Sequence, residues 1–559
     1  MTAACSYRST PRSKALVVVM TLIMICGVAS ASFPLDALQP GLEGYAITAG
    51  PNNTLERFSV EVLALQYDVG TGFPVVLVRA SGPFIERSGG IAAGMSGSPA
   101  YLPFEGQDVL LGAIAFVFPN SDHTLALVTP IEVMRTALPP TVAVHTFGRE
   151  LFGSLGPAVP VSTPLLLAGI STRASHVLDG LFRSSPVDLL PIQTNGVSPK
   201  DDESYVLEPG SAISVQLVRG DVTVAAIGTV TAVEQGHVLA FGHPLLGQGR
   251  VSFVLSPAFV SYIVPSNVVP FKLANSGRRI LGSITEDRPA AITGPLDLEP
   301  DLLPVTLTLT GKELNESKSF EVTRDERYYA PLIATATLQV FDEVLKKIGP
   351  GTSEVAWNIH LGDGETLNLL EQVSDPNDIA SATSALAATP LTILADNVFQ
   401  PADIDRIALN IRYQEEQNTA EIIEVKAEDD TLDPGQDLVA FLRLQPFRQE
   451  SVVKTLRIAL PDTLSGPVTL TFRGGNETSD DDDNSDDPLS FGELLVALRD
   501  NLQASELVVE TAVDGETTRL QRLSFPYLLS GKKTLDITVS AAKDFADEKS
   551  MPGKEAPVE

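Results

Sequence analysis

Short alternations of apolar and polar residues, separated by Gly, Pro, Asn and Asp, run through most of the chain. Examples before residue 140 are "SVEVLALQY", "PVVLVRA" and "VLLGAIAFVF". A period of two indicates half-buried strands, and the Gly- and Pro-rich breaks between them indicate tight turns. The pattern predicts a mainly β protein whose first β-rich unit covers residues 32–140.

A second alternating stretch, "AISVQLVRGDVTVAAIGTVTAVEQGHVLAFGHPLL", continues for about 35 residues. Gly220-Asp221 and Gln235-Gly236 are placed as hairpin turns within it. We expect a second β-rich unit over residues 206–298. The Pro- and Ser-punctuated residues 141–205 are expected to connect the two units.

Beyond residue 298 the pattern predicts two further β-rich modules. The runs "PVTLTLTG", "ATATLQVF", "VAWNIHLG", "TPLTILADNV" and "DRIALNIRYQ" predict the strands of a β-sandwich-like domain over 299–430. A second β-rich module is expected over 431–545, with one helix in "LSFGELLVALRDNLQ". Its aspartate-rich segment 480–487 is typical of a solvated loop, with Ca²⁺ binding as the alternative, and the polar residues 546–559 predict a disordered tail.

Composition restricts the class of partner. The 559 residues suffice for three or four domains, and the formal net charge is −31. Nucleic-acid binding depends on Lys and Arg neutralising phosphates, so the charge excludes nucleic acid as a partner. A protein or peptide partner remains, and the oligomeric state is left open.

The first 31 residues have the pattern of a secretory signal peptide. Arg8, Arg12 and Lys14 precede the apolar run "ALVVVMTLIMICGVA", and "ASA" at 29–31 offers a cleavage site. We expect a mature chain in a periplasmic, secreted or cell-surface location, without a stable membrane span. An uncleaved anchor is the alternative, although the apolar run is shorter than the roughly 20 residues that a spanning helix needs.

Cleavage of this signal removes both cysteines, Cys5 and Cys26. The mature protein then has no disulfide, zinc-thiolate site or cysteine nucleophile. No pair of histidines has metal-ligand spacing, and no phosphate-binding loop is present, so the sequence predicts neither a metal nor a cofactor.

The candidate chemistry lies in "GMSGSP" at residues 94–99. A serine attacks a carbonyl only when its hydroxyl is exposed on a tight turn beside a base, near N–H groups that stabilise the oxyanion. The flanking glycines permit such a turn, and the amides of Gly94 and Ser96 can then form an oxyanion hole. We interpret Ser96 as a nucleophile, the alternative being a plain Gly/Ser-rich turn.

The segments after this motif carry two family resemblances. The motif is followed by a strand, a second strand that contains "GAIAF", a loop, and a strand that leads to a helix-like end. This order of elements resembles the second β-barrel of trypsin-like serine peptidases. "GGIAAGMSGSP" at 89–99 is more closely similar to the sporulation stage IV B (SpoIVB-type) serine peptidase family, whose nucleophile segment is G-G-I-x-x-G-M-S-G-S-P. That family's base lies in a Gly-His pair after a strand, which "AFGHPLL" matches at His243. The resemblance implies a trypsin-like double β-barrel peptidase domain, followed here by the β-sandwich-like modules.

The chain departs from these families in several respects. Met95 replaces the aspartate of the trypsin-like motif, and Ser81 stands where the sporulation family has an acidic residue. The serine block precedes the Gly-His block by 147 positions instead of following it, an order that does not forbid a triad. No PDZ-like segment is present.

The carboxylate that would orient the His243 ring is the least determined member of the site. Asp287 follows His243 by 44 residues and is our candidate, with Asp221 and Glu86 as alternatives. A Ser-His dyad completed by water or a backbone carbonyl is a further alternative. Of the other histidines, His237 is expected in a surface turn and His123 in an exposed loop.

These observations predict a secreted or periplasmic serine endopeptidase in which Ser96, His243 and Asp287 are catalytic and the amides of Gly94 and Ser96 form the oxyanion hole. The competing hypothesis is a peptidase-like surface binding or structural protein without activity, which the missing acidic residue and the changed block order favour.

Overall fold

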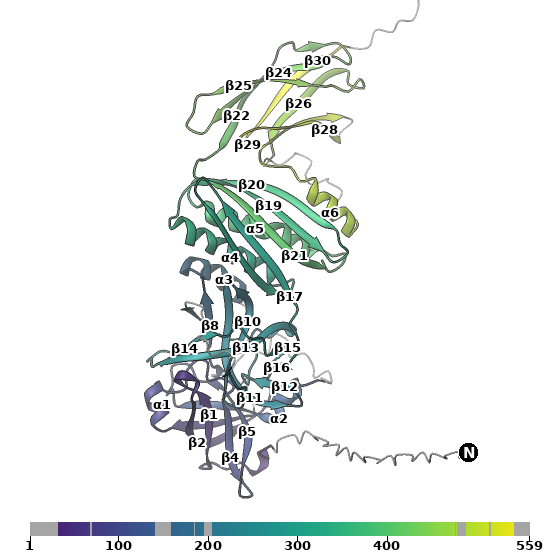
Figure 1. Cartoon of the computed structure of the whole chain (residues 1–559). Helices are drawn as coiled ribbons and strands as arrows, with labels where there is room; N and C mark the ends of the chain where they lie inside the picture. The colour runs from purple at the N-terminus through teal and green to yellow at the C-terminus, as the bar shows by residue number, and fades with distance from the viewer. Residues whose placement is uncertain are drawn as a thin grey trace, which may run out of the picture.

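The computed structural model describes residues 32–67, 70–139, 158–183, 185–194, 204–475, 477, 488–513 and 516–540. The expected signal peptide, the acidic loop 480–487 and the tail 546–559 lie outside these residues. Figure 1 shows an elongated molecule, with the two N-terminal barrels at one end and a β-sandwich at the other. The fold is mainly β, as the sequence predicts.

The first unit is a closed six-stranded antiparallel barrel. Its ring runs β4-β1-β2-β3-β6-β5 and closes through the pairing of β4 with β5. The strands are β1 (Glu43–Ala49), β2 (Leu55–Gln66), β3 (Val75–Ser81), β4 (Pro99–Phe104), β5 (Gln107–Val117) and β6 (Leu125–Pro130). Short helices complete it: α1 (Pro83–Ser88), α2 (Ile131–Met134) and the 3₁₀ turns η1 (Leu35–Ala37), η2 (Pro51–Asn53) and η3 (Arg135–Ala137).

The second unit is also a closed six-stranded barrel, with the ring β10-β13-β15-β16-β12-β11. Its strands are β10 (Ala212–Gly220), β11 (Thr223–Glu234), β12 (His237–Ala240), β13 (Gly249–Val264), β15 (Gly282–Arg288) and β16 (Ala291–Pro295). β14 (Phe271–Ser276) pairs with β13 outside the ring. The double barrel expected from the resemblance is therefore present.

The expected connector, residues 141–205, contains both strands and a helix among its described residues. β7 (Val159–Pro160) pairs with β5 of the first barrel, and β8 (Thr163–Ala168) pairs with β11 of the second. Helix α3 (Thr172–Phe182) then leads to β9 (Leu189–Thr194), which is parallel to β8. The chain thus passes directly from one barrel to the other between Pro160 and Thr163.

The next domain combines one sheet with a helical layer. Its strands, in the order β20-β19-β21-β17-β18, are β17 (Leu302–Thr310), β18 (Asn315–Thr323), β19 (Gly351–Leu361), β20 (Thr366–Asp375) and β21 (Ile404–Gln414). Helices α4 (Tyr329–Leu345) and α5 (Ile379–Asp396) pack beside it (Figure 1). The strands predicted at 334–341 and 389–398 are wrong, because these residues lie in α4 and α5.

The cause of that error is the burial of α4 on almost every side, which removes the polar face that marks a helix. Thr335 and Thr337 alternate with apolar residues as in a strand. Their hydroxyls instead donate to the carbonyls of Pro331 and Ile333 one turn earlier, at 2.8 and 2.9 Å. Helix α5 has 18 residues and a mean hydropathy of 1.2, enough to cross a membrane by length and composition, yet it packs against α4 and the sheet.

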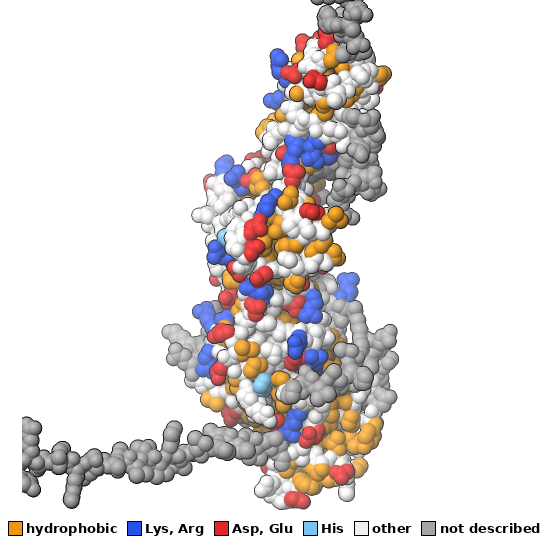
Figure 2. All heavy atoms as spheres, turned by 90° about the vertical axis from the view of Figure 1, so that its right-hand side faces the viewer, with side chains coloured by type: hydrophobic (Ala, Val, Ile, Leu, Met, Phe, Trp, Pro, Cys, Tyr) orange, Lys and Arg blue, Asp and Glu red, His pale blue; other side chains and the backbone are white. Residues whose placement is uncertain are grey.

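The C-terminal module is a sandwich of two sheets around one hydrophobic core. One sheet contains β22 (Thr419–Ala427), β24 (Leu438–Pro446), β25 (Val452–Ile458) and β29 (Leu528–Ser530). The other contains β23 (Thr431–Leu432), β26 (Gly466–Gly474), β27 (Glu506–Val513), β28 (Glu516–Ser524) and β30 (Lys532–Val539). The predicted helix is α6 (Phe491–Arg499). On the face shown in Figure 2, acidic and basic side chains are interspersed along the whole molecule.

The two barrels are joined through residues 94–97, which we call the serine turn. The amide of Thr229 on β11 donates to the carbonyl of Ser96 (2.9 Å), and the hydroxyl of Thr231 donates to that of Gly97 (2.8 Å). Gly97 has a φ of +95°, and a Cβ there would lie 1.9 Å from the Thr229 carbonyl oxygen. Only glycine permits this approach.

We therefore expect Gly97→Ala to lower the free energy of unfolding by about 3 kcal/mol or more, because it adds a clash with backbone to an unfavourable φ. Gly106→Ala is the matched control, since its φ is +78° and no atom lies within 4 Å of the added Cβ. Its cost should be the backbone strain alone, about 1–2 kcal/mol. Urea unfolding measures both; equal losses would contradict this account of the junction.

Candidate functional site

The serine turn is formed by two glycines in left-handed conformations. Gly94 has a φ of +88° and Gly97 one of +95°, as the sequence interpretation requires. The amide of Gly97 donates to the carbonyl of Ile114 on β5 (2.8 Å), and the amide of Ser98 donates to that of Met95 (3.0 Å). The turn is thus fixed to β5 on one side and to β11 on the other.

The amides of Gly94 and Ser96 were predicted as an oxyanion hole. Neither donates a hydrogen bond to any residue that the structure describes, although both residues are buried. Buried amides are nearly always paired, so two unpaired ones in a single turn are unusual. Their donors remain available for an acceptor other than the described residues.

His243 lies in a turn that follows β12. Phe116 and Phe241 flank its ring at centroid distances of 6.2 and 5.7 Å, and Gly242 before it packs on the β5 side chains Ala113 and Ala115. The ring is fully buried, and this burial lowers its pKa to about 4. The imidazole is therefore neutral at pH 7.

The hydrogen bond at Nδ1 determines the tautomer of that neutral ring. Nδ1 lies 2.6 Å from the carbonyl oxygen of Pro244, which can only accept, so Nδ1 carries the proton. Nε2 then carries a lone pair and has no hydrogen-bond partner among the described residues. This is the tautomer that a general base needs.

The structure corrects the expectation that the Ser96 hydroxyl is exposed. Ser96 and His243 are both fully buried, and in the part of the chain that the structure describes neither the Ser96 Oγ nor the His243 Nε2 has a hydrogen-bond partner. The two atoms are therefore not hydrogen-bonded to each other. The serine turn and the Gly-His turn nonetheless meet, because Gly97 packs against the backbone nitrogen of Phe241, two residues before His243.

The structure does not bring Asp287 to the imidazole. Its carboxylate accepts hydrogen bonds from the amides of Leu245 (2.7 Å), Leu246 (2.7 Å) and Gln248 (3.4 Å). It is fully buried, and desolvation raises its pKa despite these bonds. Asp287 thus holds the turn that follows Pro244, while the Pro244 carbonyl occupies the position expected of the carboxylate. This corresponds to the backbone-carbonyl alternative.

The other candidates lie away from His243. Asp221 accepts from the amide of Ser319 at the far end of β10, and Glu86 is exposed on α1. His237, expected in a surface turn, is the partly buried first residue of β12, with its Nδ1 3.2 Å from the carbonyl oxygen of Gln235. These positions agree with structural roles.

Lys272 on β14 is a feature that the sequence analysis missed. Its amide donates to the carbonyl of Ala93, its side chain passes beside Gly94, and its Nζ donates to the hydroxyls of Thr48 (2.8 Å) and Thr229 (3.2 Å). Complete burial lowers its pKa to about 7. The available signal was its inward position in the alternating run "FKLANS", where lysine is rarely found.

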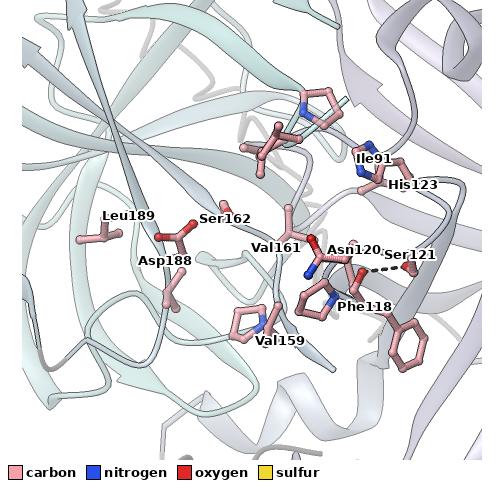
Figure 3. A pocket seen from close by; sticks show the side chains of 18 of the residues that line it. Ile91, Phe118, Asn120, Ser121, His123, Val159, Val161, Ser162, Asp188 and Leu189 are labelled. Carbon is pink, nitrogen blue, oxygen red and sulfur yellow. Dashed lines mark hydrogen bonds between the residues drawn. The ribbon is translucent and has the colours of Figure 1, made fainter. Parts of the chain in front are cut away.

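A cavity of about 650 Å³ opens beside the serine turn (Figure 3). Its walls include Ile91 and Ala93 just before the turn, and Val159, Val161 and Ser162 between the barrels. His123, expected in an exposed loop, lines this cavity and is partly buried; its carbonyl accepts from the amide of Ile91 (2.8 Å). The cavity therefore places both apolar and polar side chains next to the serine turn.

Comparison of the chain with protein-family models, curated proteins and solved structures finds no match. The likeness to the sporulation peptidases therefore depends on the motifs quoted above.

Lys272 leads to a prediction about the pH dependence of stability. The folded state binds its proton more weakly than the unfolded chain, whose lysine pKa is 10.5. Between pH 7 and 10 the unfolded state holds more protons, so this group makes the free energy of unfolding rise by up to about 1.4 kcal/mol per pH unit. Lys272→Met should remove that rise.

Urea unfolding at pH 7, 8 and 9 measures this slope, with the exposed Lys426→Met as the matched control. The control should keep the slope of the wild type. The same slope in Lys272→Met and the wild type would show that Lys272 does not titrate in this range.

Proposed function

We propose that this chain is a serine endopeptidase with Ser96 as nucleophile and His243 as general base. One observation carries the proposal. The serine turn of the first barrel meets the Gly-His turn of the second, and the two turns contain a hydroxyl, an imidazole Nε2 and two amides that have no partner among the residues described. Unsatisfied buried polar groups are costly to stability, and they concentrate at functional sites.

The chemistry follows from these four groups. The Ser96 Oγ adds to the carbonyl carbon of a peptide bond while the His243 Nε2 takes its proton. The amides of Gly94 and Ser96 stabilise the oxyanion. The imidazolium then protonates the leaving amine, and water hydrolyses the ester at Ser96, so that one peptide bond and one water yield a carboxylate and an amine.

The imidazole is oriented by a backbone carbonyl in this mechanism. The Pro244 carbonyl holds the proton at Nδ1, and Asp287 acts as a positioning residue because it fixes the amides that follow Pro244. A carbonyl stabilises the developing imidazolium less than a carboxylate does, so we expect a slower enzyme than one with a full triad.

The alternative is a peptidase-like protein that binds other proteins without cleaving them. The complete burial of Ser96 and the missing hydrogen bond between its Oγ and the His243 Nε2 favour this alternative. Under either function, the predicted signal peptide would place the protein outside the cytoplasm, where its partner would be an extracytoplasmic polypeptide.

Labelling with a fluorophosphonate probe tests the proposal. We expect slow labelling of the wild type, because Ser96 is buried, and at least a hundredfold loss in Ser96→Ala. His243→Ala should lose a similar factor, since the two groups act as a unit. Labelling is measured in a gel, and the modified peptide is identified by mass spectrometry.

Ser98→Ala is the matched control, because Ser98 lies two residues from Ser96 and its hydroxyl donates to the carbonyl of Met95 (2.6 Å). It should keep the label. A label of equal strength in Ser96→Ala, or one mapped to another residue, would contradict the proposal.

A further inference from the structure

Residues 158–164, which we call the covering segment, cross from the first barrel to the second beside the serine turn. At their beginning, β7 forms an antiparallel ladder with the edge of β5, with Pro160 opposite Phe116 and Val159 opposite Val117. The amide of Val161 continues the ladder by donating to the carbonyl of Ala115 (2.8 Å). The segment is thus extended along β5.

The other end of the segment reaches the serine turn itself. The Pro164 ring lies 3.3 Å from the position of a Cβ at Gly94, and Val161 belongs to the same hydrophobic cluster as Ile91 and Met95. The residues from Val161 to Pro164 therefore pass beside the turn that carries the buried Ser96.

The edge of β5 is a natural site for a peptide. A strand edge offers unpaired N–H and C=O groups to which an extended chain adds as a further strand. On this edge, Ala115 follows Ile114, whose carbonyl accepts from Gly97 in the serine turn. A peptide paired with Ala115 and Val117 therefore runs toward Ser96.

We propose that the covering segment is an internal pseudosubstrate, which occupies the peptide-binding edge of β5 and keeps the site closed until it is displaced. The inference rests on the proposed function, since it assigns the substrate class and the regulation of the same site. The amides of Gly94 and Ser96 do not bond the Val161 carbonyl, so the segment blocks the site without presenting a bond for attack.

The sequence of the segment, "AVPVSTP", indicates the class of peptide that would replace it. At position 161 an aliphatic side chain packs in the apolar cluster beside Ile91. At position 162 a hydroxyl donates to the carboxylate of Asp188 (2.9 Å), which also lines the cavity (Figure 3). The site thus fits an extended peptide with an aliphatic residue followed by Ser or Thr.

The test releases the segment within the full-length chain. Val161→Pro removes the amide that donates to Ala115, and we expect fluorophosphonate labelling of Ser96 to become about tenfold faster. Lys312→Pro is the control for introducing a proline, because Lys312 is exposed in the turn between β17 and β18 and its amide donates to no described residue; its rate should stay near that of the wild type. Val161→Asp, which places a charge in the apolar cluster, is a second opening variant in case Val161→Pro does not fold.

A competing peptide completes the test. Synthetic Ala-Val-Pro-Val-Ser-Thr-Pro, carrying a fluorophore, should bind the opened variant with higher anisotropy than a scrambled peptide and should slow its labelling. Equal labelling rates in the wild type and both opened variants, with Ser96 still required, would overturn the pseudosubstrate but leave the peptidase. Peptide binding by the opened variant without any labelling would support the pseudosubstrate site and contradict the peptidase. No peptide binding would overturn the inference.

Discussion

The structure depends on the close contact between the serine turn and strand β11. Gly97 permits this contact because it has no side chain, and the hydrogen bonds to Thr229 and Thr231 fix it. The same contact sets the position of Ser96 relative to the second barrel. The serine turn and the turn that carries His243, from separate barrels, therefore meet at one buried junction.

The junction between the two barrels contains several polar groups that are costly to bury. Lys272 has lost its hydration, and no described residue hydrogen-bonds to the Ser96 Oγ or the His243 Nε2. Folding tolerates such groups only when the surrounding structure supplies compensating stability. Two closed barrels provide a rigid framework for this purpose. The covering segment adds an apolar contact through Val161, which packs in the same cluster as Ile91 and Met95.

The sequence predicted the strands of the barrels and the serine turn, because period-two alternation and paired glycines are local signals. The sequence could not predict which group Asp287 binds. A carboxylate that the fold brings near a histidine can accept from the backbone amides that follow the histidine, as Asp287 does, instead of from the imidazole. The two-residue strand β7 was missed because its pairing with β5 is non-local. The strand assignment within α4 failed because a helix buried on all sides has no polar face. Lys272 was overlooked within an alternating strand.

A crystal structure of the full-length protein with the peptide aldehyde Ala-Val-Pro-Val-H tests the central claim most directly. The account predicts a hemiacetal, with a bond from the Ser96 Oγ to the aldehyde carbon. The former aldehyde oxygen should accept hydrogen bonds from the amides of Gly94 and Ser96. The peptide should pair with β5 in place of residues 159–161. An unmodified Ser96, with the aldehyde bound at another residue or not at all, would contradict it.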